Sequence, residues 1–165
     1  MIQLLFGAVQ MVGRSSTPVL VLQEQDGSRS LAVWISAGAA AAILSAIEAE
    51  SLDHPSTHDL LLEALATQSA VVESVTILSV ADGVYDAQLT VNGTAVTCRV
   101  SDGVALALRS GAPILAPEEL MAEHGIASEP VIEEPGQEDA ETQEVRQFRE
   151  FLANVRADDF DKPAR

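Results

Sequence analysis

The chain has 165 residues, which is room for one domain of ordinary size and a tail, and its hydrophobic content of 47% allows a sizeable buried core. A single cysteine, Cys98, excludes an internal disulfide and a cysteine-ligated zinc site, and it fits a reducing, cytoplasmic location. The formal net charge is −16, with more than half of the acidic residues after residue 117, and this balance argues against tight binding of nucleic acid because phosphate groups require basic partners.

The N-terminal part of the chain predicts three strands and a helix. Strand-like segments cover residues 4–12, 19–23 and 31–35, and we expect Thr17–Pro18 to separate the first two. The turn residues Gln25–Ser28 join the second and third strands into a hairpin. A helix is expected next, from about Ala39 to Glu50. Its buried face is predicted to carry Ala39, Ile43, Ala46 and Ile47.

An uncharged stretch from Ser30 to Ile47 is barely long enough for a membrane span. Its first part is strand-like, and its second part is rich in alanine rather than leucine. A strand, a turn at Ser36–Gly38 and a buried helix therefore explain the stretch better than a membrane span does. We also expect no signal peptide, since no basic segment precedes an apolar one at the N-terminus.

The middle of the chain predicts a helix that opens at Ser56 and then three strands. The helix is expected to turn Leu61, Leu62 and Leu65 inward. The strand over 71–80 alternates poorly, which suggests burial on both faces. The strand over 84–91 alternates cleanly, and Asn92–Gly93 is a strong hairpin signal between it and the next strand. The residues expected on one face of this alternating strand are Tyr85, Ala87, Leu89 and Val91.

The last part predicts two further helices, an acidic linker and a tail. A helix is expected over 101–109, stopped by Gly111, and a short one over 118–124 after Pro117. Residues 127–141 have the composition of a solvated acidic linker. Residues 142–165 predict a C-terminal amphipathic helix and tail, which would dock on its own domain or on a partner chain.

Together these elements predict an α+β domain over residues 1–126. Its antiparallel or mixed sheet is built from β-hairpins and packed with about three helices, and the C-terminal amphipathic helix follows the linker. Trp34, on an alternating strand, is interpreted as a core or interface residue, and Cys98 as a small buried apolar residue rather than a nucleophile.

Two helix starts share a pattern that could carry chemistry. STHD (56–59) and RVSDG (99–103) each place a hydroxyl at the cap and an aspartate in the first turn of a helix. If the two starts meet, Asp59 and Asp102 could hold Mg²⁺ or Mn²⁺, His58 could act as general acid or base, and Arg99 could bind phosphate. The structural alternative is two well-capped helices, with Arg99 paired to a nearby acid.

Three segments, in this order and spacing, resemble the bifunctional nuclease domain family. They are VWI, THDLL and CRVSDGVALALRSGAPI, and the family's segments are approximately LPIWIG, RPLTHDLL and RPSDAIALALR-GAPI. The resemblance covers about residues 2–126, and the C-terminal helix resembles the tail of actinobacterial members. It implies an α+β domain that forms a homo-oligomer, a dimer or higher, and that acts on DNA and RNA. The matching positions are Thr57, His58, Asp59, Arg99, Ser101 and Asp102.

The chain also departs from the family pattern. The family's arginine before THD is missing from His54–Ser56, and an acidic residue after the tryptophan is missing from Ser36–Ala40. Two hypotheses therefore stand. One is a metal-assisted nuclease in which His58, Asp59 and Asp102 are catalytic and Thr57, Arg99 and Ser101 bind substrate. The other is a catalytically silent divergent paralogue, an oligomeric interaction module. A compact, solvent-open cluster of His58, Asp59, Arg99 and Asp102 favours the first.

Overall fold

The structure is a computed structural model, and it describes residues 1–14, 16–48 and 54–127. The strands are β1 (Ile2–Val12), β2 (Thr17–Glu24), β3 (Arg29–Trp34), β4 (Val72–Ala81), β5 (Val84–Val91), β6 (Thr94–Cys98), β7 (Ile114–Ala116) and β8 (Ile126–Ala127). The helices are α1 (Ala37–Glu48), α2 (Thr57–Thr67), α3 (Val100–Ser110) and α4 (Glu118–His124). Within the described residues this is an α+β fold, as the sequence predicted.

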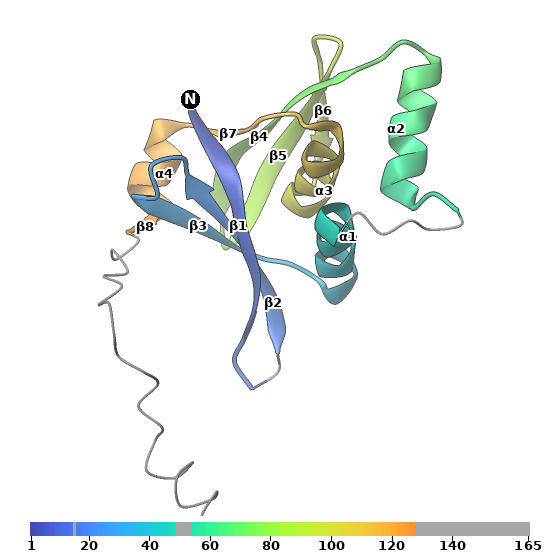
Figure 1. Cartoon of the computed structure of the whole chain (residues 1–165). Helices are drawn as coiled ribbons and strands as arrows, with labels where there is room; N and C mark the ends of the chain where they lie inside the picture. The colour runs from blue at the N-terminus through green and yellow to red at the C-terminus, as the bar shows by residue number, and fades with distance from the viewer. Residues whose placement is uncertain (15, 49–53, 128–165) are drawn as a thin grey trace, which may run out of the picture. The chain divides into compact units, whose positions relative to one another are not determined.

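The strands form one mixed sheet in the order β6-β5-β4-β7-β1-β2-β3-β8 (Figure 1). The sheet consists of two antiparallel hairpin groups, β1-β2-β3 and β4-β5-β6. The short strand β7 joins them, because it pairs antiparallel with β1 and parallel with β4. The predicted hairpin turn at Asn92–Gly93 is confirmed, and Asp82–Gly83 forms a second one. All four residues have positive φ, as tight turns between antiparallel strands require.

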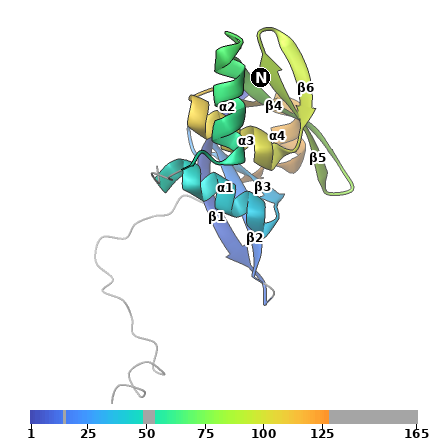
Figure 2. The ribbon, with the colours of Figure 1, turned by 90° about the vertical axis from the view of Figure 1, so that its right-hand side faces the viewer.

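Helices α1, α2 and α3 lie on one side of the sheet, and Figure 2 shows them in front of it. Helix α3 is the central one: it packs on α1, α2, β4 and β5. Most of its residues are buried, and Gly111 ends it with a left-handed φ of 74°. The predicted stop at Gly111 is therefore confirmed. The largest fully buried side chains are Leu4, Leu20, Leu22, Leu31, Ile43, Ile77, Met121, Val75 and Val104.

The sheet curls so that β3 and β5 approach each other, although they are not neighbours in the strand order. The Tyr85 hydroxyl of β5 donates a hydrogen bond to the Ala32 carbonyl of β3 over 3.3 Å. The end of β3, the start of β5 and the start of α3 therefore meet at one place.

Several predicted details were wrong. Thr17 and Pro18 do not separate the first two strands: β1 ends at Val12, β2 already begins at Thr17, and Pro18 lies inside β2 opposite Met11. A proline is tolerated near the first residue of a strand. Strand β4 is not buried on both faces, since Glu73 and Leu78 are exposed.

The predicted inner faces of α1 and α2 were also partly wrong. Ile47 of α1 and Leu61 of α2 are 47% and 43% exposed. Helix α2 has no fully buried residue because its main neighbour is α3, and of its leucines only Leu62 and Leu65 are partly buried.

Among the described helices, none combines the length and the apolar character that a membrane crossing requires. The uncharged stretch from Ser30 to Ile47 instead divides between β3 and α1. Residues 128–165 lie outside the described residues. The acidic linker 127–141, the C-terminal helix in 142–165 and the domain boundary at residue 126 therefore stay predictions.

Candidate functional site

The start of α2 is a complete capping box. The Ser56 hydroxyl accepts a hydrogen bond from the Asp59 amide, and the Asp59 carboxylate accepts one from the Ser56 amide. The Ser56 hydroxyl also donates to Asp59 Oδ2 over 2.5 Å. These bonds satisfy amides that a helix start otherwise leaves without partners. The structural interpretation of Ser56 and Asp59 is therefore confirmed.

The second oxygen of Asp59 faces Arg109, near the end of α3. The distance from Arg109 Nε to Asp59 Oδ1 is 2.9 Å, and the arginine side chain is only 8% exposed. Its other N–H groups donate to the carbonyls of Ala42 and Ala105 and to the Ser45 hydroxyl. One buried guanidinium thus ties α1, α2 and α3 together.

The Ser56 hydrogen bond and then the nearby Arg109 charge hold the pKa of Asp59 below its usual range. The carboxylate is therefore ionised at neutral pH and fully engaged in holding α2 in place. We interpret Asp59 as a positioning residue.

His58 points in another direction from Asp59, since successive helix residues are turned by about 100°. Its Nε2 lies 3.7 Å from Oδ1 of Asp102, in the first turn of α3. The same carboxylate binds Arg99, with Nε to Oδ2 at 2.7 Å and Nη2 to Oδ1 at 3.0 Å. His58, Asp102 and Arg99 therefore form one cluster, which we call the His58 cluster.

The His58 cluster is open to solvent. The side chains of His58, Asp102 and Arg99 are 19%, 31% and 75% exposed. The hydrogen bond to Asp102 raises the pKa of the Arg99 guanidinium, so Arg99 carries its charge throughout the accessible pH range. A histidine, a carboxylate and a fixed positive charge therefore meet at a surface that a phosphate group can reach.

The two predicted hydroxyl residues lie at these helix starts. Thr57 is the exposed first residue of α2. Ser101 lies in the first turn of α3 and is only 8% exposed. The cap of α3 is Arg99, which makes no side-chain cap hydrogen bond, so the predicted capping hydroxyl at Ser101 was wrong. The first amides of α3 therefore have no side-chain partner at the cap.

A recess of about 240 Å³ adjoins the His58 cluster. We call it the Trp34 recess, and its lining residues are Val33, Trp34, Ile35, Ser36, Gly83, Val84, Tyr85, Arg99, Val100 and Ser101. Trp34 is 60% exposed, so the core alternative of its interpretation was wrong, and the interface alternative stays a prediction. The alternation of β3 could have revealed this, because Leu31 and Val33 take the buried face and turn Trp34 to the other.

The residues present do not fit a ready-made divalent-metal site. Asp59 is bound by Arg109, and Asp102 by Arg99, so each carboxylate already faces a cation. Within residues 1–14, 16–48 and 54–127, no three His, Cys, Asp or Glu side chains gather in a way that could hold a metal ion. No step below is therefore assigned to a metal held by Asp59 and Asp102.

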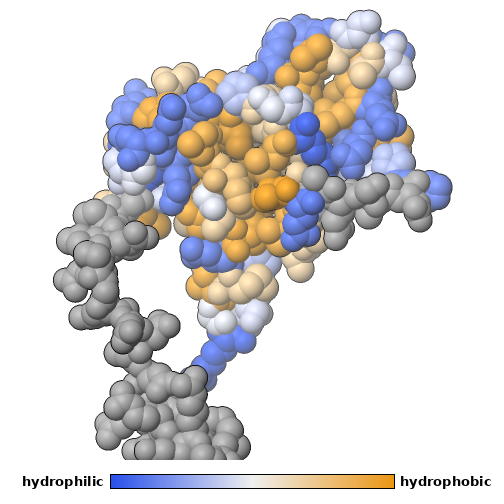
Figure 3. Space-filling view, in the orientation of Figure 1, coloured by the Kyte–Doolittle hydropathy of each residue, from blue (hydrophilic) through white to orange (hydrophobic). Residues whose placement is uncertain are grey.

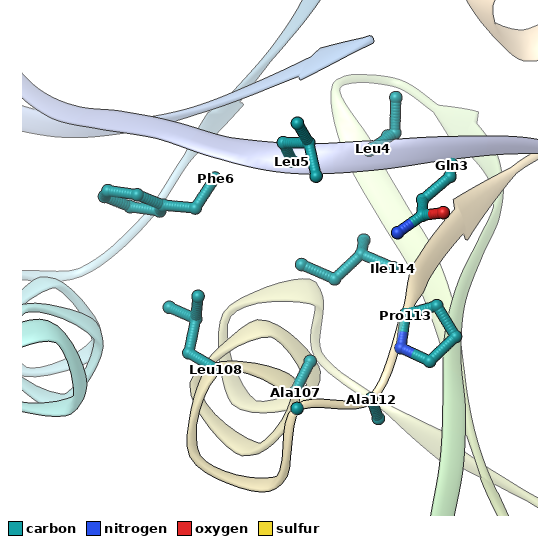
Figure 4. A pocket seen from close by; sticks show the side chains of 10 residues that line it. Gln3, Leu4, Leu5, Phe6, Ala107, Leu108, Ala112, Pro113 and Ile114 are labelled. Atoms are coloured by element: carbon teal, nitrogen blue, oxygen red, sulfur yellow. The ribbon is translucent and has the colours of Figure 1, made fainter. Parts of the chain in front are cut away.

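A second recess, of about 410 Å³, lies between β1 and α3. Figure 4 shows Leu5 and Phe6 of β1 facing Leu108 and Ala107 of α3 across it. None of its lining residues is charged. It is therefore suited to an apolar occupant rather than to a phosphate group.

Comparisons with known proteins agree with the resemblance noted above. The sequence model of the bifunctional nuclease domain family matches residues 20–129 of this chain. Two curated relatives are the uncharacterized proteins MT1877 and Rv1829, from two strains of Mycobacterium tuberculosis. Each is 36% identical to this chain over 166 residues, which cover 93% of this chain and 98% of the relative. The chain therefore belongs to the bifunctional nuclease domain family.

Proposed function

We propose that this protein is a nuclease that hydrolyses phosphodiester bonds of DNA or RNA at the His58 cluster. One observation carries the proposal: His58 Nε2 lies 3.7 Å from a carboxylate oxygen of Asp102, and that same carboxylate holds Arg99 beside the open start of α3. Membership of the bifunctional nuclease domain family is consistent with this activity.

Arg99 and the start of α3 are the phosphate-binding part of the proposed site. Arg99 uses Nε and Nη2 for Asp102, and its remaining N–H groups face solvent at a side chain that is 75% exposed. Together with the first amides of α3 they offer donors and positive potential to a phosphodiester. Thr57 and Ser101 add hydroxyl groups at the two helix starts.

His58 is the proton-transfer group of the proposed site. It takes a proton from the attacking water as the water oxygen bonds to phosphorus and the P–O bond to the leaving oxygen breaks. The leaving oxygen takes a proton from solvent, and His58 later gives its proton to solvent. Asp102 orients the imidazole. The gap of 3.7 Å is longer than a hydrogen bond, and we expect it to close when a phosphate occupies Arg99.

The assay uses labelled single-stranded and double-stranded DNA and RNA. We expect His58→Ala to reduce the cleavage rate by about 10²- to 10⁴-fold, the range for loss of a general acid–base group. His54→Ala is the matched control, because His54 is exposed and makes no contact in the His58 cluster. Wild-type protein that folds but does not cleave, or a His58→Ala variant as active as His54→Ala, would contradict the proposal.

The same assay tests the predicted use of Mg²⁺ or Mn²⁺ at Asp59 and Asp102. Each reaction is run with either ion and with chelator, on the wild type and on Asp59→Asn and Asp102→Asn. Activity that requires the ion and is lost in both variants would support a metal that assembles with the substrate. Activity in chelator would leave Asp102 as the partner of His58 and Asp59 as a positioning residue.

An oligomeric interaction module is the second candidate function, and an apolar face favours it. Figure 3 shows apolar side chains over the middle of the face that carries β1, α1 and α3. Leu5 of β1, which lines the recess of Figure 4, and Leu44 and Ile47 of α1 are between 38% and 47% exposed. Isolated monomers rarely expose large apolar patches. We therefore propose a homo-oligomer, a dimer or higher, formed through this face.

Light scattering of the full-length protein tests the oligomer, and Leu44→Glu is the variant that should break it. A wild-type mass equal to that of one chain would refute it.

The cytoplasmic location is also part of the proposal, in keeping with the single cysteine. Recovery of the protein from the membrane or the medium in cell fractionation would contradict that location.

A further inference from the structure

The Trp34 recess continues directly from the proposed phosphate site, and Arg99 belongs to both. Arg99 lines the recess while it also binds Asp102 of the His58 cluster. The recess has about 240 Å³, below the ~300–1,000 Å³ of ordinary small-molecule sites. A ligand whose phosphate rests on Arg99 can therefore place one adjoining group of limited size in the recess.

The wall of the recess offers a large aromatic face. Trp34 is 60% exposed at the end of β3, and its indole makes no hydrogen bond with the described residues. Tryptophan is enriched at binding interfaces because its indole combines a large apolar face with a polar N–H, and the exposed indole of Trp34 lines a recess. A flat aromatic partner would cover the indole most completely.

The recess is not acidic, in spite of the acidity of the chain. Arg99 is the only charged residue among those that line it, and no carboxylate is among them. The charge of Arg99 is itself paired with Asp102, so the recess is close to neutral, while its free N–H groups can still donate to a phosphate. The acidic residues behind the net charge of −16 therefore do not line the recess, which removes part of the objection to nucleic acid that composition raises.

Ser101 supplies a polar group that lacks a partner. Its side chain belongs to a residue only 8% exposed, it lines the recess, and its hydroxyl makes no hydrogen bond with the described residues. Among the described residues, no fully enclosed side-chain oxygen or nitrogen lacks a partner, so the Ser101 oxygen must be accessible. An accessible hydroxyl at the wall of the recess can bind water or exchange it for a donor or acceptor of a ligand.

We propose that the Trp34 recess binds one unstacked base of a single-stranded nucleic acid, with Trp34 as its stacking surface and Ser101 as a polar contact. The adjoining phosphate then lies at Arg99 and the His58 cluster. A base inside a duplex is covered on both faces by its neighbours and cannot reach the indole, so the recess selects single strands. This inference rests on the proposed nuclease function and narrows its substrate class.

The test measures binding separately from cleavage. Trp34 is the only tryptophan of the chain, so its fluorescence reports directly on the recess. The probe is a short phosphorothioate oligothymidylate, which resists cleavage, and the control probe is an abasic strand of equal length and charge. We expect the oligothymidylate to quench the fluorescence of the full-length protein and the abasic strand to leave it unchanged.

Variants are compared by anisotropy of the same probe carrying a fluorescein label. Trp34→Ala should weaken binding by about 5- to 150-fold, which corresponds to the ~1–3 kcal/mol of one base–aromatic stack. Trp34→Phe should restore most of the affinity. Val96→Ala is the matched control, because Val96 is an exposed apolar residue of β6 outside the recess, and it should bind as the wild type does.

The outcomes separate this inference from the proposed function. Quenching by the oligothymidylate without any cleavage would uphold the recess and refute the nuclease. Cleavage with the same KM in the wild type and Trp34→Ala would uphold the nuclease and refute the recess. Equal affinity for the abasic strand would also refute it, as would a change of oligomeric state in Trp34→Ala, since Trp34 would then belong to an interface between copies.

Discussion

Replacing Arg109 by methionine should destabilise the protein strongly, because this side chain joins three helices from a buried position. Methionine keeps much of the side-chain volume and removes every donor. The change leaves the Ala42 and Ala105 carbonyls and the Ser45 hydroxyl without their Arg109 partner, and it removes the ion pair with Asp59.

The magnitude follows from these four interactions. Three hydrogen bonds to neutral acceptors contribute ~1 kcal/mol each. The Asp59 carboxylate is 40% exposed, so solvent screens the ion pair and its contribution is no more than ~1 kcal/mol. The expected loss is therefore ~3–4 kcal/mol, a large part of the ~5–15 kcal/mol that stabilises a typical domain.

Urea unfolding followed by far-ultraviolet circular dichroism measures this loss. Tryptophan fluorescence is a poorer probe of unfolding, because Trp34 is already exposed in the folded protein. Arg14→Met is the matched control: Arg14 lies exposed in the turn after β1, and its replacement should change the free energy of unfolding by less than ~0.5 kcal/mol. A loss below ~1 kcal/mol in Arg109→Met would refute the view that Arg109 ties the helices together.

Two further predictions concern stability. The pKa of Asp59 is held low by Ser56 and then Arg109, so its ionised form stabilises the fold above the usual pKa and this contribution is lost as the pH falls through the lowered value. The stability gap between wild type and Asp59→Asn should therefore be full at pH 6 and shrink below about pH 4; an unchanged gap at pH 3 in urea titrations would argue against it. Gly103→Ala should destabilise α3 by ~1 kcal/mol net, because the new methyl would lie 2.7 Å from Val75 Cγ1, and overpacking outweighs the better helix propensity of alanine. A double-mutant cycle with Val75→Ala should show that the two changes cost less together than separately, and simple additivity would contradict the predicted contact.

Local structure was predictable where neighbouring residues decide it. The capping box at Ser56, the turns at Asp82–Gly83 and Asn92–Gly93 and the stop at Gly111 all depend on side chains and φ angles within a few residues. Burial was less predictable: Ile47 and Leu61 have the right spacing for an inner face, yet their helices have no neighbour on that side among the described residues to cover them.

The candidate site was likewise predictable only in part. The motifs indicated that His58, Asp59, Arg99 and Asp102 belong together, and the starts of α2 and α3 do meet. Helix geometry then separates neighbours in sequence, since His58 faces Asp102 while Asp59 faces Arg109, fifty residues along the chain. No local pattern contains that distant guanidinium.

What the sequence by itself determined is the α+β class, the family and the helix starts that carry the polar residues. Only the tertiary structure decided which residues share a surface. The curl of the sheet brings β3 to β5, and that approach leaves Trp34 at the edge of a recess beside Arg99 rather than in the core. The physical reason is that caps and turns depend on short-range hydrogen bonds, whereas exposure and partnership depend on chain segments far apart in sequence.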